Sequence, residues 1–295
     1  REHYHRDTRV GGWCFSDEHH RWPVSDCTAE ALSGLRYLAD VLPAERLPSP
    51  ERLVQAALFI LTRQNPDGGW GSYERNRGGA ILRRLNPSEM FGNCMVEYSY
   101  VECTASCMQA LSHALERFGS LFSARERARI QRALRRGETL LRKSQEADGG
   151  WQGFWGVNYT YGTMFGITGL LAAGNPVTDP AIQRACVWLV DHQHPQGGWG
   201  ESWRGCYEEK YVPHEEPQVI MTAWALMALL RARYDGPGAQ EAIERGVKLL
   251  VERQWEDGDW PKEGVAGVFF NTAYHHYMLY KNYFPLWALG LYLNR

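Results

Sequence analysis

Four copies of one short pattern constrain the fold of this 295-residue sequence more than any other feature. Each copy is a glutamine followed six residues later by a tryptophan, and three of the copies have Gly-Gly directly before the tryptophan. The four pairs are Gln64 and Trp70, Gln145 and Trp151, Gln193 and Trp199, and Gln254 and Trp260. Each pair follows a stretch with the apolar spacing of a helix packed on one side, at 51–63, 126–144, 179–192 and 240–253. Glycines then supply turn residues that end these helices.

A second set of helical stretches alternates with the first and is richer in apolar and small residues. We expect these helices at 26–42, 102–118, 159–173, 219–231 and 284–293. Outer amphipathic helices that alternate with inner apolar ones predict an all-α fold, an α/α barrel or toroid of helical hairpins, with residues 1–295 as one domain. Three inner helices start with Cys-Thr-Ala or Met-Thr-Ala, so Asp26, Glu102 and Cys103 are expected at the same end of the barrel.

The helix count predicts that the barrel is incomplete. Five inner and four outer helices are fewer than the six of each that close such a ring, so we expect the missing elements to come from another segment. The chain starts at Arg1 without a methionine, which favours a fragment or a processed product. We therefore expect this portion to have low stability by itself.

Composition argues against several classes of function. The net charge of −2 comes without a run of Lys or Arg, so we expect no nucleic-acid partner. Seven cysteines contain no CxxC pair, which argues against zinc-ribbon spacing and favours reduced thiols facing the cytosol. We expect neither a metal nor a cofactor. No stretch reaches 18 apolar residues, so nothing in the sequence predicts a bilayer-spanning helix.

Asp26 has two possible roles at the start of the first inner helix. Aspartate is a common N-cap, and a helix N-terminus favours the carboxylate form. A catalytic acid must instead be protonated, which requires burial in an apolar cavity to raise its pKa. Thiols at Cys27 and Cys103 can orient such an acid without adding negative charge, provided that they stay protonated. Spacing alone leaves both roles open.

Motifs along the whole chain match one family in order. The glutamine–tryptophan pairs resemble the QW repeats of the triterpene cyclases, and residues 25–30 contain the Asp-Cys-Thr-Ala-Glu motif of the oxidosqualene cyclases. Further matches are Tyr73-Glu-Arg-Asn-Arg-Gly-Gly79, Asn86-Pro-Ser-Glu89, Val101-Glu-Cys-Thr104, Thr160-Tyr-Gly-Thr163, Ala266-Gly-Val-Phe269 and Phe284-Pro-Leu-Trp-Ala-Leu-Gly290. The sequence thus resembles the second half of an oxidosqualene cyclase of the lanosterol or cycloartenol synthase type.

The resemblance implies a reaction and assigns roles to residues. It implies cyclisation of (3S)-2,3-oxidosqualene, with Asp26 as the acid that opens the epoxide and Cys27 and Cys103 as its hydrogen-bond partners. Squalene–hopene cyclases resemble this sequence but carry Asp-x-Asp-Asp, whereas the position here holds a single aspartate. An epoxide is more basic than an alkene and releases strain on opening, so one neutral carboxyl is sufficient. The single aspartate therefore favours the epoxide substrate.

Aromatic side chains are expected to stabilise the cationic intermediates, by roughly 0.5–2 kcal/mol each, without offering a lone pair. The resemblance assigns this role to Phe15, Tyr73, Trp151, Phe269 and Tyr277. Trp151 also closes a repeat, and the other repeat tryptophans are expected to be structural.

Three further positions bear on the product. Val24 resembles the lanosterol-forming members of the family, whereas His20 resembles the cycloartenol-forming ones, and we favour lanosterol. Tyr274-His275-His276 stands where many family members resemble one another in having a less polar stretch. A histidine there is either the base that removes the final proton or part of a hydrogen-bonded pair on the surface.

The family resemblance also implies partners: the N-terminal half of the enzyme and one leaflet of a membrane, from which the C30 substrate arrives. Residues 90–96 are a candidate for the entrance channel or an ordinary core segment. Two other functions remain open. A protein prenyltransferase β-subunit is also a helical barrel but requires a zinc site, and a degenerate cyclase-like scaffold would bind lipid without catalysis.

Overall fold

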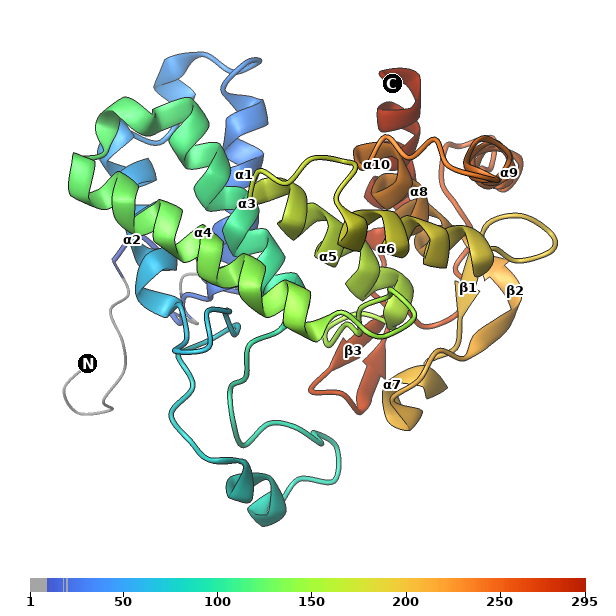
Figure 1. Cartoon of the computed structure of the whole chain (residues 1–295), viewed down its shortest axis with the longest axis horizontal. Helices are drawn as coiled ribbons and strands as arrows, with labels where there is room; N and C mark the ends of the chain where they lie inside the picture. Colours follow the sequence, from blue (N-terminus) through green and yellow to red (C-terminus); the bar gives the residue numbers. More distant parts are fainter. Residues whose placement is uncertain (1–9, 18, 20) are drawn as a thin grey trace. The chain divides into compact units, whose positions relative to one another are not determined.

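The computed structural model describes residues 10–17, 19 and 21–295 (Figure 1). The chain forms two compact units. The first unit consists of Arg1–Leu85, Met95–Lys143 and Ala172–Gly174, and the second unit consists of Asn86–Cys94, Ser144–Leu171 and Asn175–Arg295. No helix in the described part of the chain is long and apolar enough to cross a membrane.

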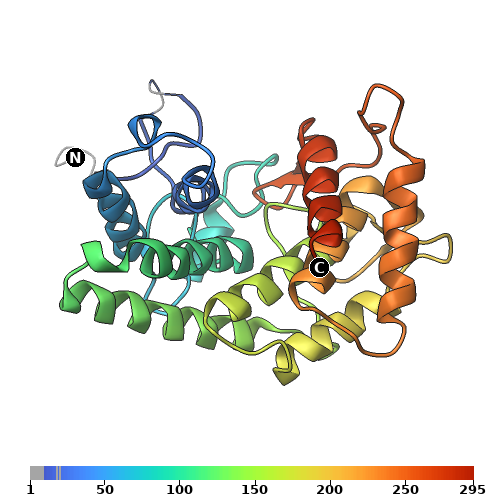
Figure 2. The same cartoon turned by 90° about the horizontal axis from the view of Figure 1, so that it is seen from above.

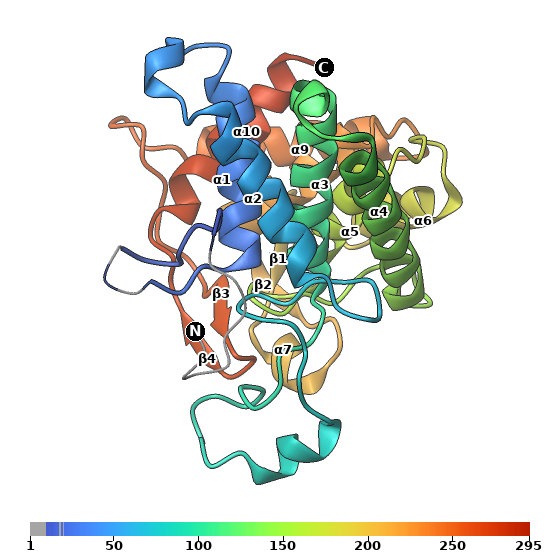
Figure 3. The same ribbon diagram turned by 90° about the vertical axis from the view of Figure 1, so that its left-hand side faces the viewer.

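The first unit is built on four α-helices: α1 (Ser25–Leu38), α2 (Pro50–Arg63), α3 (Val101–Phe118) and α4 (Ala124–Ser144). Short 3-10 helices lie at Ala44–Arg46 (η2), Ala80–Leu85 (η3) and Gly119–Leu121 (η4). Helices α1, α2 and α3 pack against one another, as Figure 3 shows. Helix α3 buries most of its side chains, whereas α4 buries only one stripe. This difference is the one expected between an inner and an outer helix.

The second unit surrounds one buried helix. Its helices are α5 (Tyr159–Ala172), α6 (Pro180–Asp191), α7 (Arg204–Glu208), α8 (Val219–Arg231), α9 (Ala239–Glu252) and α10 (Tyr280–Leu293). Helix α8 contacts α6, α9 and α10, and α10 runs beside it in Figure 2. Two antiparallel hairpins complete the unit, β1 (Trp199–Glu201) with β2 (Pro213–Gln218), and β3 (Gly267–Phe269) with β4 (Ala273–His275).

The observed helices confirm both sets of predicted helices, with small differences at the ends. Helix α1 stops at Leu38 rather than residue 42, and α10 starts at Tyr280, four residues before the predicted residue 284. Pro285 lies inside α10, in its second turn, where it lacks the N–H that would bond to the Lys281 carbonyl. The sequence predicts neither helix α7 nor the two hairpins. The hairpin strands are only three to six residues long and show no sustained alternation of apolar and polar residues.

The repeat glutamines connect one outer helix to the next. The side-chain amide of Gln64 donates to the Gly68 carbonyl at 2.8 Å and to the Ala133 carbonyl in α4 at 2.9 Å. Gln145 makes the same second bond to Ala181 in α6, and Gln193 makes it to Ala242 in α9. The glutamine therefore satisfies carbonyl groups where one helix ends and the next passes by.

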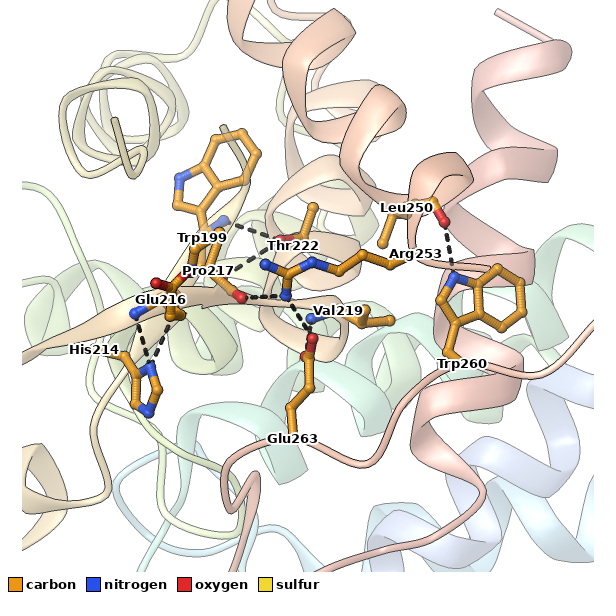
Figure 4. Close-up of polar contacts among 10 residues, drawn as sticks. All are labelled: Trp199, His214, Glu216, Pro217, Val219, Thr222, Leu250, Arg253, Trp260 and Glu263. Atoms are coloured by element: carbon orange, nitrogen blue, oxygen red, sulfur yellow. Dashed lines mark hydrogen bonds and ion pairs between the residues drawn. The ribbon is translucent and has the colours of Figure 1, made fainter. Parts of the chain in front are cut away.

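The repeat tryptophans anchor the helix that precedes them and the inner helix that follows. The indole N–H donates to the carbonyl ten residues earlier in the pairs Trp70 and Ile60, Trp199 and Leu189, and Trp260 and Leu250. The backbone N–H of Trp199 also donates to the Thr222 hydroxyl at 2.9 Å, as Figure 4 shows. This threonine is the middle residue of Met-Thr-Ala, so the shared start of the inner helices is a docking point for the repeat.

The structure reveals a fifth repeat that the glutamine–tryptophan spacing does not detect. Trp13 follows Gly11-Gly12, and its backbone N–H donates to the Thr28 hydroxyl at 2.9 Å, as Trp70 does to Thr104. Gly11 has a φ of +89°, and a Cβ there would lie 2.3 Å from the Gln55 carbonyl oxygen, so only glycine fits. The Gly-Gly-Trp triplet was the signal in the sequence that identifies this repeat.

Candidate active site

Asp26 lies in the first turn of α1 but is not its N-cap. The N-cap is Val24, whose extended backbone precedes the helix and whose side chain makes no capping bond. The Asp26 carboxyl instead accepts the backbone N–H of Cys27 at 2.8 Å. The role of simple N-cap is therefore wrong for Asp26, and the carboxyl is held beside the helix start by its own neighbours.

Two thiols contact the Asp26 carboxyl. The Cys103 Sγ lies 3.8 Å from Asp26 Oδ2, in hydrogen-bond geometry, and the Cys27 thiol also bonds to the carboxyl. Burial above all, together with the Asp26 charge, raises the pKa of Cys27 to about 12 and that of Cys103 well above its ordinary value. Both thiols therefore stay protonated near neutral pH and act as donors. Protonated thiols can orient the acid without adding negative charge beside it.

Burial raises the pKa of the Asp26 carboxyl above its usual value. Hydrogen bonds from the Cys27 backbone and from the Cys103 and Cys27 thiols act in the opposite direction but are the smaller effect. Desolvation thus outweighs the donors around the carboxyl, and the protein favours the protonated form more than water does. A carboxyl in this state can serve as a general acid.

Three of the four other predicted residues of the first unit lie in the described part of the chain. Val24 is buried, directly before α1, and the Tyr73 ring packs against Trp22 with 5.1 Å between centroids. Phe15 is 51% exposed. His20 lies outside the described residues. The assignments of Phe15, Tyr73, Val24 and His20 to the cavity stay predictions.

The remaining predicted aromatics belong to the second unit. Phe269 and His275 share one face of the β3–β4 hairpin, because the register pairs Gly267 with His275 and Phe269 with Ala273. The Tyr277 ring packs at 4.3 Å from His275. Phe269, His275 and Tyr277 therefore form one cluster. Two of its members, Phe269 and Tyr277, are aromatics expected from the sequence to stabilise cations.

Trp151 and His276 lie in different surroundings. Trp151 is fully buried, and its backbone N–H donates to the Thr163 hydroxyl at 3.0 Å, the same bond that Trp13, Trp70 and Trp199 make. Its role as a cavity aromatic stays a prediction. His276 lines a small pocket with Glu263, Tyr277 and Lys281, and desolvation lowers its pKa.

Sequence reasoning missed three residues around Asp26. Ser25 donates its backbone N–H to the Ser72 carbonyl at 2.7 Å, the Ser72 hydroxyl lies 3.3 Å from Cys103 Sγ, and Glu97 accepts the Ser72 N–H. Ser72 and Glu97 stand in no distinctive motif, and all three contacts join residues 25 or more positions apart. Among the side chains that the structure describes, no three His, Cys, Asp or Glu residues cluster in a manner suited to a metal ion.

Comparison with known proteins identifies the family. The squalene-hopene cyclase C-terminal domain family matches residues 2–294. The chain is 43% identical over 293 residues to lanosterol synthase from Homo sapiens, covering 97% of this chain and 39% of that protein. It is 45% identical over 291 residues to cycloartenol synthase from Dictyostelium discoideum, covering 99% of this chain and 40% of that protein. The chain belongs to the squalene-hopene cyclase C-terminal domain family, with relatives of the oxidosqualene cyclase type.

A solved structure supports the fold. A variant of the type II terpene cyclase MstE from Scytonema, in complex with merosterolic acid A, aligns with a TM-score of 0.65 at 19% sequence identity. The alignment covers 97% of this chain and 76% of that one. At this identity the likeness concerns the fold alone, and it confirms the all-α class with helical hairpins that alternation in the sequence predicts.

Proposed function

We propose that this protein cyclises (3S)-2,3-oxidosqualene to a tetracyclic sterol precursor, with lanosterol as the product. The observation that carries the proposal is the Asp26 carboxyl, whose pKa burial raises and which two protonated thiols contact. Membership of the cyclase family supports the reaction class. Relatives named lanosterol synthase and cycloartenol synthase support the epoxide rather than the plain alkene as substrate.

Asp26 starts the cascade by giving its proton to the epoxide oxygen. The carbon–oxygen bond breaks as the π electrons of the neighbouring alkene form the first ring bond, so the positive charge moves to the far carbon of that alkene. Aromatic faces at Tyr73, Phe269 and Tyr277 stabilise the charge as successive rings form. A base then removes one proton from carbon, and the C–H electrons close the final alkene. The overall change is an isomerisation, with no cofactor consumed.

The proposal extends to the setting of the enzyme. The chain spans about two fifths of the length of the relatives it matches. We therefore place the complete cavity in an assembly of this chain with the N-terminal half of the enzyme. The C30 substrate is confined to lipid, so we place the protein on one cytosol-facing leaflet as a monotopic enzyme. Met90, which is 64% exposed, supports an apolar entrance in segment 90–96.

The test is an incubation of the detergent-solubilised complete cyclase with (3S)-2,3-oxidosqualene, followed by gas chromatography–mass spectrometry. A matched Asp26→Asn variant keeps the shape of the side chain but has no acidic proton. We expect a tetracyclic sterol from the wild type, and a loss of at least about 10²-fold in the variant. A folded wild type without cyclic product favours the lipid-binding scaffold, and a fully active variant removes Asp26 from the mechanism.

A further inference from the structure

The carboxylate of Glu97 holds the chain segment that lies against the acid. It accepts the backbone N–H of Ser72 and, at 3.3 Å, the backbone N–H of Tyr73. The approach is close, because a Cβ on Gly71 would lie 2.6 Å from the Glu97 side chain. Glycine at position 71 is therefore required for Glu97 to reach the segment.

The segment that Glu97 holds contacts both sides of the Asp26 site. Ser25, the residue before Asp26, donates its backbone N–H to the Ser72 carbonyl at 2.7 Å and its hydroxyl to the Gly71 carbonyl. On the other side, the Ser72 hydroxyl lies 3.3 Å from Cys103 Sγ, and that thiol lies 3.8 Å from Asp26 Oδ2. A shift of residues 71–73 would thus move the start of α1 and the thiol donor together.

Glu97 also interacts with the acid through charge. Burial above all, and then the nearby charges of Asp26 and Glu74, raise the pKa of Glu97 to about 7 against the opposing effect of the two N–H donors. The Tyr100 hydroxyl also faces this carboxyl, and burial and the Glu97 charge both raise the Tyr100 pKa. The Asp26 charge is thus among the groups that act on Glu97, which places the two carboxyls near each other.

We propose that Glu97 is a positioning residue for the initiating acid: it fixes residues 71–73 so that Ser72 orients the Cys103 thiol toward Asp26. This inference rests on the proposed function of Asp26. Glu97 itself does not touch the substrate in this account.

The test compares Glu97→Gln with Glu201→Gln in the complete cyclase. Glu201 is a matched control, because it is a fully buried carboxyl that accepts the backbone N–H groups of Tyr159 and Thr160 at 2.9 and 3.0 Å, but in the second unit. Glutamine keeps an oxygen acceptor but loses the charge that strengthens both N–H bonds, so we expect Glu97→Gln to loosen residues 71–73 and to lower kcat about 10-fold, with little change in KM. A loosened Ser72 weakens the Cys103 bond that lowers the Asp26 pKa, so the alkaline limb of the kcat profile should move to higher pH. Glu201→Gln should leave that limb in place.

The outcomes separate the possible failures. A Glu97→Gln enzyme with an unshifted limb and a kcat equal to that of Glu201→Gln overturns the inference. If Glu97→Gln does not fold, Ser72→Ala takes its place, since it keeps the backbone bonds and removes only the hydroxyl at Cys103. A fall in kcat for Ser72→Ala supports the inference, and an unchanged kcat overturns it. A wild type without cyclic product contradicts the proposed function itself and removes the basis of the inference.

Discussion

At the scale of single residues, the site depends on which groups surround Asp26 rather than on the aspartate alone. A helix N-terminus stabilises a carboxylate, so Asp26 in the first turn of α1 would ordinarily be ionised. Burial works against this, and the nearest polar side chains, Cys27 and Cys103, are neutral thiols. Thiols donate weaker hydrogen bonds than hydroxyls or ammonium groups, so they orient the carboxyl while lowering its pKa only slightly.

Replacement of Cys103 by alanine tests the contribution of that donor. The Cys103→Ala enzyme loses the 3.8 Å contact with Asp26 Oδ2, and we expect kcat to fall roughly 2- to 10-fold, the worth of one net hydrogen bond. Because this bond lowers the Asp26 pKa, its loss should move the alkaline limb of the kcat profile to higher pH. Cys186→Ala is the control, since burial alone raises the pKa of that thiol. Equal kcat values for the two variants would contradict the role of Cys103.

The pKa of Asp26 also predicts how stability varies with pH. A carboxyl with a folded-state pKa above its unfolded value contributes stability that is fully present below the unfolded pKa and is lost as pH rises through the folded pKa. The asparagine of the Asp26→Asn variant does not titrate. The Tm of Asp26→Asn minus that of the wild type should therefore increase as pH rises from 4 to 8, which differential scanning fluorimetry measures. A difference that is constant across this range would show that the folded protein does not perturb Asp26.

At the scale of elements, the repeats of Trp70 and Trp199 are three-way joints between two outer helices and one inner helix. The glutamine amide binds the next outer helix, the indole N–H binds the previous one, and the tryptophan backbone binds a threonine of the inner helix. Other elements are joined by a partly buried carboxylate, that of Glu263. Glu263 accepts the Val219 N–H at the start of α8 and pairs with Arg253 of the short segment after α9, both at 2.5 Å (Figure 4).

Substitution of one repeat tryptophan tests this joint. In Trp199→Phe the Leu189 carbonyl loses its buried donor. We therefore expect the free energy of unfolding, measured by urea denaturation, to fall by about 1–3 kcal/mol. Trp255→Phe is the matched control, because Trp255 is 53% exposed, and its change should stay within about 0.5 kcal/mol. Equal losses for the two variants would show that the indole bond is not important for the fold.

The helices and the acid could be predicted from the sequence because both are encoded locally. Helix periodicity gave both helix sets, and the residues 25–30 motif identified Asp26. Contacts made by the folded chain could not be predicted in this way. Glu97 reaches Ser72 across 25 positions, and Trp13 was missed because its repeat lacks the glutamine. His275 joined Phe269 and Tyr277 only once the hairpin register was known.

At the scale of the whole molecule, the chain corresponds to about two fifths of its relatives, and its surface agrees with a further partner segment. Helix α10 and the residue before it expose three leucines seven positions apart: Leu279 at 66%, Leu286 at 58% and Leu293 at 81%. Such a stripe is costly in water and is typical of a helix that packs against another element. We propose that the N-terminal half of the enzyme covers it.

Separate expression of the two parts tests this proposal. We expect the 295-residue chain alone to give no cyclic product from oxidosqualene, because the cavity lies between the two halves of the enzyme in our account. Addition of the separately expressed N-terminal half should restore sterol formation, measured by gas chromatography–mass spectrometry. Substitution of Leu286 by glutamate should weaken the restoration. Turnover by the isolated chain would contradict the proposal.

The most direct test of the account is the protonation state of Asp26 itself. Infrared difference spectroscopy between Glu97→Gln and the Glu97→Gln/Asp26→Asn double variant, recorded at pH 7 on the complete cyclase, reports this one carboxyl. The Glu97→Gln background is needed because the Glu97 pKa of about 7 responds to the Asp26 charge. The account predicts that a protonated carboxyl band is lost in the double variant. If a carboxylate band is lost instead, Asp26 is ionised in the resting protein, and it cannot be the acid that opens the epoxide.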